Sequence, residues 1–403
     1  MTETSLRHDH EAGEAVESAD SSAGAAPLRV LMVAPSLDML GGQAVQAARL
    51  LERWREDPAL DVSLLPINPR LPGPLRKLQT IKYIRTVLTS LYYCATLLTR
   101  VRRYDVIHIF SASYLSFVLA PTPAILVARL YGKKTVLNYR SGEAEDHLQR
   151  WGRTALPIIR LVDTIVAPSA YLVDVFAHFG LRARWIFNFV DTERFRFRER
   201  HPLRPFFLAN RNFEPLYNVA CVLRAFALIQ RGFPEAHLTL VGDGSQRGEL
   251  ENLARELRLR NTQFIGRAAP ERMPELYDAA DIYLNGSDID NMPGSIIESY
   301  ASGLPVVTTD AGGIPYILTD KDTGLMVPRG DHRAMAACAI RLLKDQALAF
   351  AIIGRARAEC QKYSWAAVRG EWLKLYHEAG SAKAARGSEQ TPSGEVRGAR
   401  VVG

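Results

Sequence analysis

Two carboxylates in the second half of the chain, Asp290 and Glu298, stand on either side of an expected helix start. Asp290 follows the apolar run DIYLNG, and Glu298 comes after Pro293, a residue suited to the first turn of a helix. We therefore expect Asp290 at the carboxyl end of a strand and Glu298 slightly more than one turn into the following helix, both facing one crevice. Carboxylates accept hydrogen bonds from sugar and ribose hydroxyls, and a helix N-terminus suits a diphosphate.

A purely structural explanation of this pair is that Asp290 caps the helix and Glu298 is a solvated charge. The residues around Glu298, which include Ile296, Ile297 and Tyr300, leave little polar face for a solvated acid. Because burial of an unpaired acid costs free energy, a carboxylate kept in this apolar setting indicates a function.

Short apolar runs alternate with helical patterns through most of the chain. They are apolar throughout, which is typical of parallel strands covered on both faces by helices. We therefore predict an α/β protein with two doubly wound, Rossmann-like parallel-sheet domains facing a cleft, the usual ligand site of such sheets. The runs are RVLMVAP, DVSLLPI, DVIHIF, KTVLNY, DTIVAP and RWIF in the first half, and PFFLAN, HLTLVG, TQFIG, DIYLNG, PVVTT and GLMVP in the second.

The predicted domain boundaries follow changes in composition. The charged, Pro-containing segment FRFRERHPLR at 195–204 has no periodicity and indicates a join. Both ends of the chain are poor in large apolar residues and are expected to be disordered. The expected division is an acidic tail at 1–27, a first domain at 28–197, a second domain at 204–363, a helix packing back across the join at 364–380, and a tail at 381–403.

Composition narrows the class of protein. The chain of 403 residues has 47% hydrophobic and 23% charged residues, as in a soluble globular protein, and its net charge of +7 favours anionic partners. No basic-then-apolar leader and no apolar run of transmembrane length is present, so we expect a cytoplasmic location. The cysteines form no CxxC pair, which favours a reducing compartment and argues against structural zinc; they are Cys94, Cys221, Cys338 and Cys360.

The stretch DNMPGSIIESYASGLPVVTTDAGGIP resembles the donor-site signature of the family 4 glycosyltransferases, which have GT-B architecture. In that signature an acid, seven residues and a glutamate precede a small-residue helix, G-x-PVV and GG-x-P. The stretches VGDGSQRGELENLA, QFIGRAAPERMPELYDAADIYLNGS and DTGLMVPRGD match the family's order and spacing, and IFNFVDTERF at 186–195 looks like the segment that closes the first domain. The resemblance covers about residues 28–380.

The resemblance implies a retaining glycosyltransferase whose first domain holds the acceptor and whose second domain holds a nucleotide-sugar. Glu298 would bind the ribose hydroxyls and Asp290 the transferred sugar. Arg211, after the first strand of the second domain, would meet the diphosphate, although a surface ion pair with Glu214 is the simpler structural explanation. The implied donor site also contains Gly242, Gly294 and Ser295, and the glycines Gly41 and Gly42 would lie beside the diphosphate and acceptor.

Departures from the family pattern bear on catalysis. A lysine usually follows the phosphate-binding arginine, whereas Leu216 and Tyr217 stand there. Many members have a histidine after the strand KTVLNY, whereas Arg140 follows it here. Because an arginine stays cationic, we expect Arg140 to act as a second catalytic residue that stabilises a leaving diphosphate. His147 is expected to be an ordinary histidine on a helix surface.

Residues 75–103 are basic at both ends, apolar in the middle, and free of acids. This pattern suits a helix at an anionic membrane surface, and the protein would then be peripheral on the inner face of the cell membrane. A buried crossover helix with solvated ends explains the same pattern, and a crossover is required at this place in the fold.

The sequence leaves two functions open. The first is transfer of a sugar to a glycan or lipid-linked acceptor in cell-surface polysaccharide or glycolipid synthesis; the second is a weak or inactive sugar-nucleotide-binding protein, favoured by the missing lysine and histidine. No cofactor and no metal are expected, because no acid cluster has metal spacing. The G-x-G-x-x-x-G spacing of VGDGSQRG argues against a dinucleotide-dependent oxidoreductase, and the lack of a recognition motif argues against nucleic-acid binding.

Overall fold

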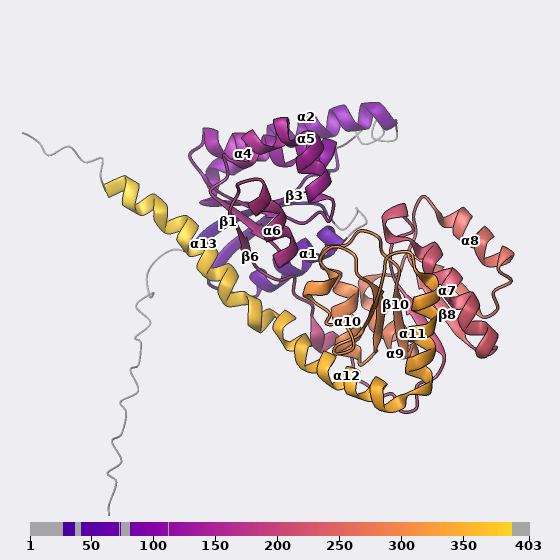
Figure 1. Ribbon diagram of the computed structural model, residues 1–403. Coiled ribbons are helices and arrows are strands. Elements are labelled where there is room, and N and C mark those ends of the chain that lie inside the picture. The colour runs from indigo at the N-terminus through magenta and orange to yellow at the C-terminus, as the bar shows by residue number, and fades with distance from the viewer. Residues whose placement is uncertain (1–26, 37–41, 72, 74–80, 112, 389–403) are drawn as a thin grey trace, which may run out of the picture.

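The computed structural model describes residues 27–36, 42–71, 73, 81–111 and 113–388. Gly41, most of the two expected tails and part of the basic stretch therefore lie outside the described residues. Within them, the chain forms two parallel six-stranded sheets flanked by helices (Figure 1), which confirms the predicted fold class. Each of the twelve apolar runs overlaps one strand.

The first sheet has the strand order β2-β1-β3-β4-β5-β6, and every pair is parallel. Alternate residues of β1 serve two separate cores: Leu31 and Val33 face one side, Val30 and Met32 the other. Both faces are therefore buried, as the continuous apolar runs require. The strands are Leu28–Ala34 (β1), Leu60–Pro66 (β2), Val106–Ser111 (β3), Lys134–Tyr139 (β4), Thr164–Ala167 (β5) and Ala183–Trp185 (β6).

Helices cover the two faces of the first sheet unequally. One face carries most of the crossover helices, and the other carries one crossover helix and the last helix of the chain. On the first face lie Lys82–Arg100 (α2), Tyr114–Leu119 (α3), Pro121–Leu130 (α4), Ala144–Ile159 (α5) and Ala170–His178 (α6); on the second lie Gly42–Arg55 (α1) and Trp365–Ser388 (α13).

The second sheet has the order β12-β11-β10-β7-β8-β9, again with parallel pairs. Its strands are Phe206–Ala209 (β7), His237–Val241 (β8), Thr262–Gly266 (β9), Ile282–Asn285 (β10), Val306–Thr309 (β11) and Leu325–Val327 (β12). Its helices are Val219–Gly232 (α7), Arg247–Glu256 (α8), Met273–Ala279 (α9), Gly294–Ser302 (α10), His332–Lys344 (α11) and Gln346–Cys360 (α12).

The last helix, α13, leaves the second half and runs along the first (Figure 1). Trp372 and Tyr376 on this helix are buried in the same core as Val30 and Val136 of the first sheet. The helix continues to Ser388, past residue 380 where the sequence analysis placed its end. The Ala-rich segment that follows residue 380 favours helix, which explains the extension.

Candidate active site

Asp290 and Arg211 meet at the carboxyl edge of the second sheet. Strands β7 and β10 are hydrogen-bonded neighbours, so the loops that follow them start side by side. Arg211 Nη2 lies 2.6 Å from Asp290 Oδ2. Asp290 also accepts hydrogen bonds from the Ser287 hydroxyl at 3.2 Å and from the backbone N–H of Asn291 at 3.0 Å. Two of the predicted site residues are thus brought together, and the partner of Arg211 is Asp290 rather than Glu214.

The Arg211–Asp290 pair is largely buried and electrostatically coupled. Burial raises the pKa of Asp290, and the Arg211 guanidinium opposes this rise. The Arg211 guanidinium also lies 4.2 Å from the centre of the Tyr217 ring, a cation–π distance. Arg211 Nε and Asn210 Oδ1 are buried and have no hydrogen-bond partner among the described residues. Unpaired buried donors and acceptors of this kind are uncommon and indicate a place for a polar ligand.

Close backbone contacts explain three glycines of this region. A Cβ at Gly312 would overlap the carbonyl oxygen of Asp290, and one at Gly313 would overlap that of Asn291. Gly312 also has a φ of +51°, which favours glycine. A Cβ at Gly242 would likewise overlap the carbonyl oxygen of Arg211. These glycines allow the loops that carry Asp290 and Arg211 to pack tightly against their neighbours.

Glu298 lies on α10, with both carboxylate oxygens occupied. Arg49 Nη2 of α1 lies 2.8 Å from Glu298 Oε1, and the Tyr277 hydroxyl donates to Oε2 at 2.8 Å. Arg49 belongs to the first half of the chain, so this ion pair joins the two halves. Sequence reasoning missed Arg49 and Tyr277. The spacing of Gln46, Arg49 and Arg53 places three polar residues on one face of α1, a pattern that indicates a polar contact for this face but does not identify the partner.

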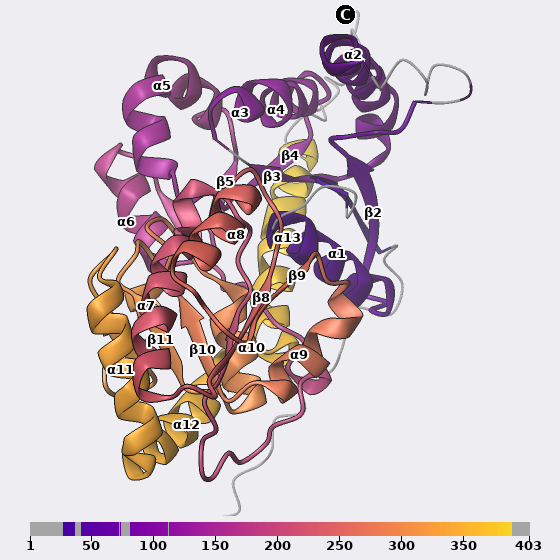
Figure 2. The same cartoon turned by 90° about the vertical axis from the view of Figure 1, so that its right-hand side faces the viewer.

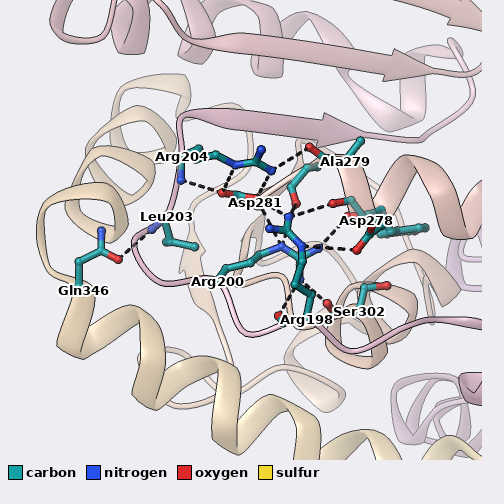
Figure 3. A network of polar contacts seen from close by, with 11 residues as sticks. Arg198, Arg200, Leu203, Arg204, Asp278, Ala279, Asp281, Ser302 and Gln346 are labelled. Carbon is teal, nitrogen blue, oxygen red and sulfur yellow. Dashed lines mark hydrogen bonds and ion pairs between the residues drawn. The ribbon is translucent and has the colours of Figure 1, made fainter.

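The segment between the two sheets is anchored to the second half by arginines (Figure 3). Arg204 bonds both carboxylate oxygens of Asp281, and Arg198 bonds one of them. Arg200, only 3% exposed, donates to the carbonyls of Tyr277 and Ala280 at the end of α9 and to that of Ser302 at the end of α10. Guanidinium groups stabilise helix C-termini in this way. The network therefore holds α9 and α10, which carry Tyr277 and Glu298.

Arg140 follows β4 in the first half and faces the second half through Asn188. It donates to the side-chain oxygens of Asn188 and Asn138 and lies 5.4 Å from the centre of the Phe110 ring. Among the described residues no carboxylate pairs with Arg140, and burial lowers its pKa to about 9. An uncompensated guanidinium at this position favours an anionic ligand.

The remaining predicted site residues differ in burial. Gly294 and Ser295 begin α10, next to the Asp290 loop, and Ser295 is buried. Gly42 begins α1 and is exposed, while Gly41 lies outside the described residues. The expectation for His147 was wrong: its side chain is fully buried. Its Nδ1 lies 2.7 Å from the Tyr139 hydroxyl, and its ring packs edge-to-face against that of Tyr114.

Neither a metal site nor a membrane span is found in the described part of the chain. There, no group of three histidine, cysteine, aspartate or glutamate side chains lies close enough to hold a metal ion. None of its helices is both long enough and apolar enough to cross a bilayer.

Comparisons with known proteins identify related families and folds. The family model "Glycosyltransferase Family 4" matches residues 40–194, and "Glycosyl transferases group 1" matches residues 191–359. The chain is 26% identical over 310 residues to the sulfoquinovosyl transferase SQD2 of Arabidopsis thaliana, a match covering 71% of this chain and 59% of that protein. It is 31% identical over 165 residues to a D-inositol 3-phosphate glycosyltransferase of Corynebacterium aurimucosum, covering 39% of each. These alignments thus span less than two thirds of the relatives' own length.

Solved structures share the fold. The structure of Anabaena HepE in complex with UDP and glucose matches with a TM-score of 0.66 and 17% identity, over 90% of this chain and 99% of that one. Sucrose-phosphate synthase of Thermosynechococcus elongatus matches with a TM-score of 0.67 and 18% identity, over 88% and 100%. These structures, at 17% and 18% identity, show the shared GT-B fold. The two family models, which together span residues 40–359, identify the chain as a glycosyltransferase of the family 4 type.

Proposed function

We propose that this protein transfers a sugar from a nucleotide-sugar donor to a glycan or lipid-linked acceptor, with retention of anomeric configuration, in cell-surface polysaccharide or glycolipid synthesis. The observation that carries the proposal is the group Arg211, Asp290 and Glu298 at the carboxyl edge of the second sheet. A relative named as a phosphatidyl-myo-inositol mannosyltransferase supports a lipid acceptor.

Each side chain has one role in the proposed reaction. Glu298 accepts hydrogen bonds from the ribose hydroxyls, and Asp290 accepts one from the transferred sugar. Arg211 and the N-terminus of α10 hold the diphosphate. The bond between the sugar C1 and the diphosphate oxygen breaks, the acceptor oxygen bonds to C1, and the acceptor proton passes to the diphosphate. Arg140 stabilises the charge that develops on that diphosphate.

Retention is proposed without a covalent intermediate on the protein. Asp290 is engaged by Arg211, Ser287 and the Asn291 backbone, so its carboxylate is poorly placed to attack a sugar carbon. A diphosphate that accepts the acceptor proton removes the need for a protein base, and positioning and electrostatics then supply the catalysis.

The direct test is release of nucleotide from a panel of UDP-glucose, UDP-N-acetylglucosamine and GDP-mannose, with and without acceptor extracts. We expect turnover with at least one donor and a loss of about 100-fold or more in Glu298→Gln, because a lost charged hydrogen bond to the substrate is costly. Glu249→Gln, an exposed acid on α8, is the matched control and keeps full activity.

A catalytically weak sugar-nucleotide-binding protein is the second candidate. It is favoured by the missing lysine at Leu216–Tyr217 and by the arginines that already occupy Asp290 and Glu298. Saturable binding of a nucleotide-sugar without turnover, across all donors and acceptors tried, would support this candidate and reject the transferase.

We further propose that the first half lies on an anionic membrane surface. The structure adds α3 and α4 to the basic stretch: these helices and α2 lie together at one end of the first half (Figures 1 and 2). From residue 75 to 131 the sequence contains a single acid, Asp105. We define the apolar face as the exposed side chains Ile84, Val87, Leu91 and Leu98 of α2, Leu115, Val118 and Leu119 of α3, and Leu126 and Leu130 of α4.

The exposure of these apolar side chains supports a lipid surface as the partner of the apolar face. Leu91 is 63% exposed and Leu130 is 71% exposed, and basic residues including Arg85 and Arg129 lie on the same helices. A basic, apolar helical surface suits insertion among anionic headgroups.

Sedimentation with phosphatidylglycerol vesicles tests the membrane proposal. The protein is expected to sediment with these vesicles at low salt and to remain in the supernatant with phosphatidylcholine vesicles. Leu91→Glu with Leu130→Glu abolishes sedimentation, whereas Phe350→Glu on α12, which replaces an equally exposed apolar residue in the second half, leaves it unchanged. Equal sedimentation of both variants would reject the apolar face as the binding surface.

A further inference from the structure

Asn188 lies where the first half meets the loop that carries Asp290. It belongs to the segment between β6 and the second sheet and is 8% exposed. Its side-chain oxygen accepts a hydrogen bond from Arg140, and its side-chain nitrogen donates to the carbonyl of Met292 at 3.2 Å. Because a guanidinium is only a donor and a carbonyl only an acceptor, these two partners leave the Asn188 amide a single orientation.

Asn188, which bonds the Met292 carbonyl, also fixes the position of the Arg140 side chain. Met292 stands between Asp290 and Gly294, the first residue of α10. Asn188 therefore ties Arg140 to the start of α10, the helix end to which the proposed function assigns the diphosphate. The backbone of Gly142 packs against residues 289–291 in the same place, so this part of the first half follows the Asp290 loop closely.

The groups around Arg140 are neutral, in contrast to those around other arginines of the site. Arg211 and Arg49 are each paired with a carboxylate. Arg140 instead bonds two amides, those of Asn188 and Asn138. An amide oxygen orients a guanidinium by hydrogen bonding but leaves its charge uncompensated, whereas a carboxylate would neutralise it.

A buried chain of hydrogen bonds supports Arg140 from behind. The Asn138 amide donates to His108 Nε2 at 3.1 Å, and His108 Nδ1 lies 2.7 Å from the Tyr376 hydroxyl of α13. Since Nε2 accepts, Nδ1 carries the proton and donates to Tyr376. Burial lowers the pKa of His108 to about 3, so the ring is neutral and adds no charge beside Arg140.

We propose that Asn188 is a positioning residue that orients Arg140 toward the second phosphate of a bound nucleotide and, being neutral, leaves the charge of Arg140 free for that phosphate. The inference rests on the proposed function, because it assigns a partner to the same site. A residue that merely joins the two halves would act without Arg140. The contribution of Asn188 to diphosphate binding, in contrast, requires Arg140 and depends on the Asn188 side chain being uncharged.

The experiment compares binding of nucleoside diphosphates and monophosphates by calorimetry, using UDP with UMP and GDP with GMP. The readout is the preference for the diphosphate, the ratio of the two dissociation constants. Asn188→Asp places a carboxylate against Arg140 and is expected to reduce this preference about tenfold, with little change in monophosphate affinity. Asn188→Ser stays neutral but loses the orientation, and is expected to reduce it about threefold.

A double-mutant cycle with Arg140→Gln separates positioning from packing. Without the guanidinium, Asn188→Asp is expected to change the preference less than twofold, because no charge remains to be neutralised. If Asn188→Asp does not fold, Asn138→Asp replaces it in the experiment, because its carboxylate would lie against a different nitrogen of Arg140. This variant is also expected to reduce the preference for the diphosphate.

Distinct outcomes overturn the inference and the proposed function. If the aspartate and serine variants behave alike, or if the aspartate effect persists in Arg140→Gln, Asn188 serves packing alone and the inference is rejected while the function stands. If the unmodified protein binds neither nucleotide pair, the proposed function fails and the inference fails with it.

Discussion

Two ion pairs of the site have similar geometry and different origins. Arg211 and Asp290 lie 2.6 Å apart with side chains 16% and 9% exposed, and Arg49 and Glu298 lie 2.8 Å apart with side chains 12% and 11% exposed. The first pair joins neighbouring loops of one sheet. The second joins α1 of the first half to α10 of the second, across 249 residues of sequence.

The distance and burial of an ion pair therefore do not by themselves determine whether it stabilises the fold or the arrangement of the two halves. Arg211 and Asp290 come together whenever the second sheet folds, so separating them requires local unfolding. Arg49 and Glu298 separate if the two halves move apart, and water can then hydrate both charges. We therefore expect the first pair to contribute to folding stability and the second to contribute to the arrangement of the halves.

The largest expected effect is that of Arg211→Gln. The change leaves Asp290 buried without its cation, and removal of one member of a buried pair destabilises by about 3–5 kcal/mol. Chemical denaturation monitored by circular dichroism measures this loss. Arg260→Gln, an exposed arginine, is the control, and adding Asp290→Asn should restore part of the stability. A loss of less than about 1 kcal/mol in the free energy of unfolding would show that this pair contributes no more than a surface ion pair.

The pH dependence of stability distinguishes the contribution of the ion pairs from that of two buried, neutral histidines in the first half. Burial lowers the pKa of His108 to about 3 and that of His147 to about 4, from an ordinary 6.5. Each ring is neutral in the folded protein and protonates on unfolding, so its contribution to stability is complete above pH 6.5 and is lost as pH falls toward these values.

At pH 5.5 each histidine is expected to cost about 1 kcal/mol relative to neutral pH. Thermal unfolding at both pH values measures the loss, and His108→Gln should reduce it by about half. An unchanged pH dependence in this variant would assign the loss to other groups, the ion pairs included.

Tyr277→Phe tests the second hydrogen-bond partner of Glu298. The variant removes the hydroxyl that donates to Glu298 and accepts from Asn210 Nδ2 at 2.8 Å. The expected loss of stability is about 1–2 kcal/mol, because buried partners are left unsatisfied. Denaturation of the variant, compared with Tyr92→Phe on α2, measures the difference. A neutral result would show that Glu298 is held by Arg49 alone.

The smallest effect on stability is expected for Arg49→Gln. Opening of the halves lets Glu298 hydrate, so the free energy of unfolding should fall by less than about 1 kcal/mol, as for an exposed pair. The radius of gyration from small-angle scattering should instead increase, whereas Arg211→Gln should leave it unchanged. If Arg49→Gln destabilises as much as Arg211→Gln, the comparison between the two pairs fails.

Local sequence patterns determined much of what the structure contains. Twelve apolar runs predicted twelve parallel strands, because a strand buried on both faces is recognisable from its own residues. The order of strand, loop and helix around Asp290 and Glu298 followed from Pro293 and the preceding run, and this was enough to place both acids at one edge of the sheet. The division into domains remains a prediction.

Only the tertiary structure decided which side chains meet. Arg49, Tyr277 and Asn188 carry no local signal of their partners, since those contacts arise from the packing of helices and from the docking of one half on the other. His147 was misjudged for the same reason: its burial depends on the Tyr114 and Tyr139 rings, which reach it only in the folded first half. Periodicity along the chain predicts elements, because it reflects the nearest neighbours, whereas the pairing of charges across a site depends on where those elements finally lie.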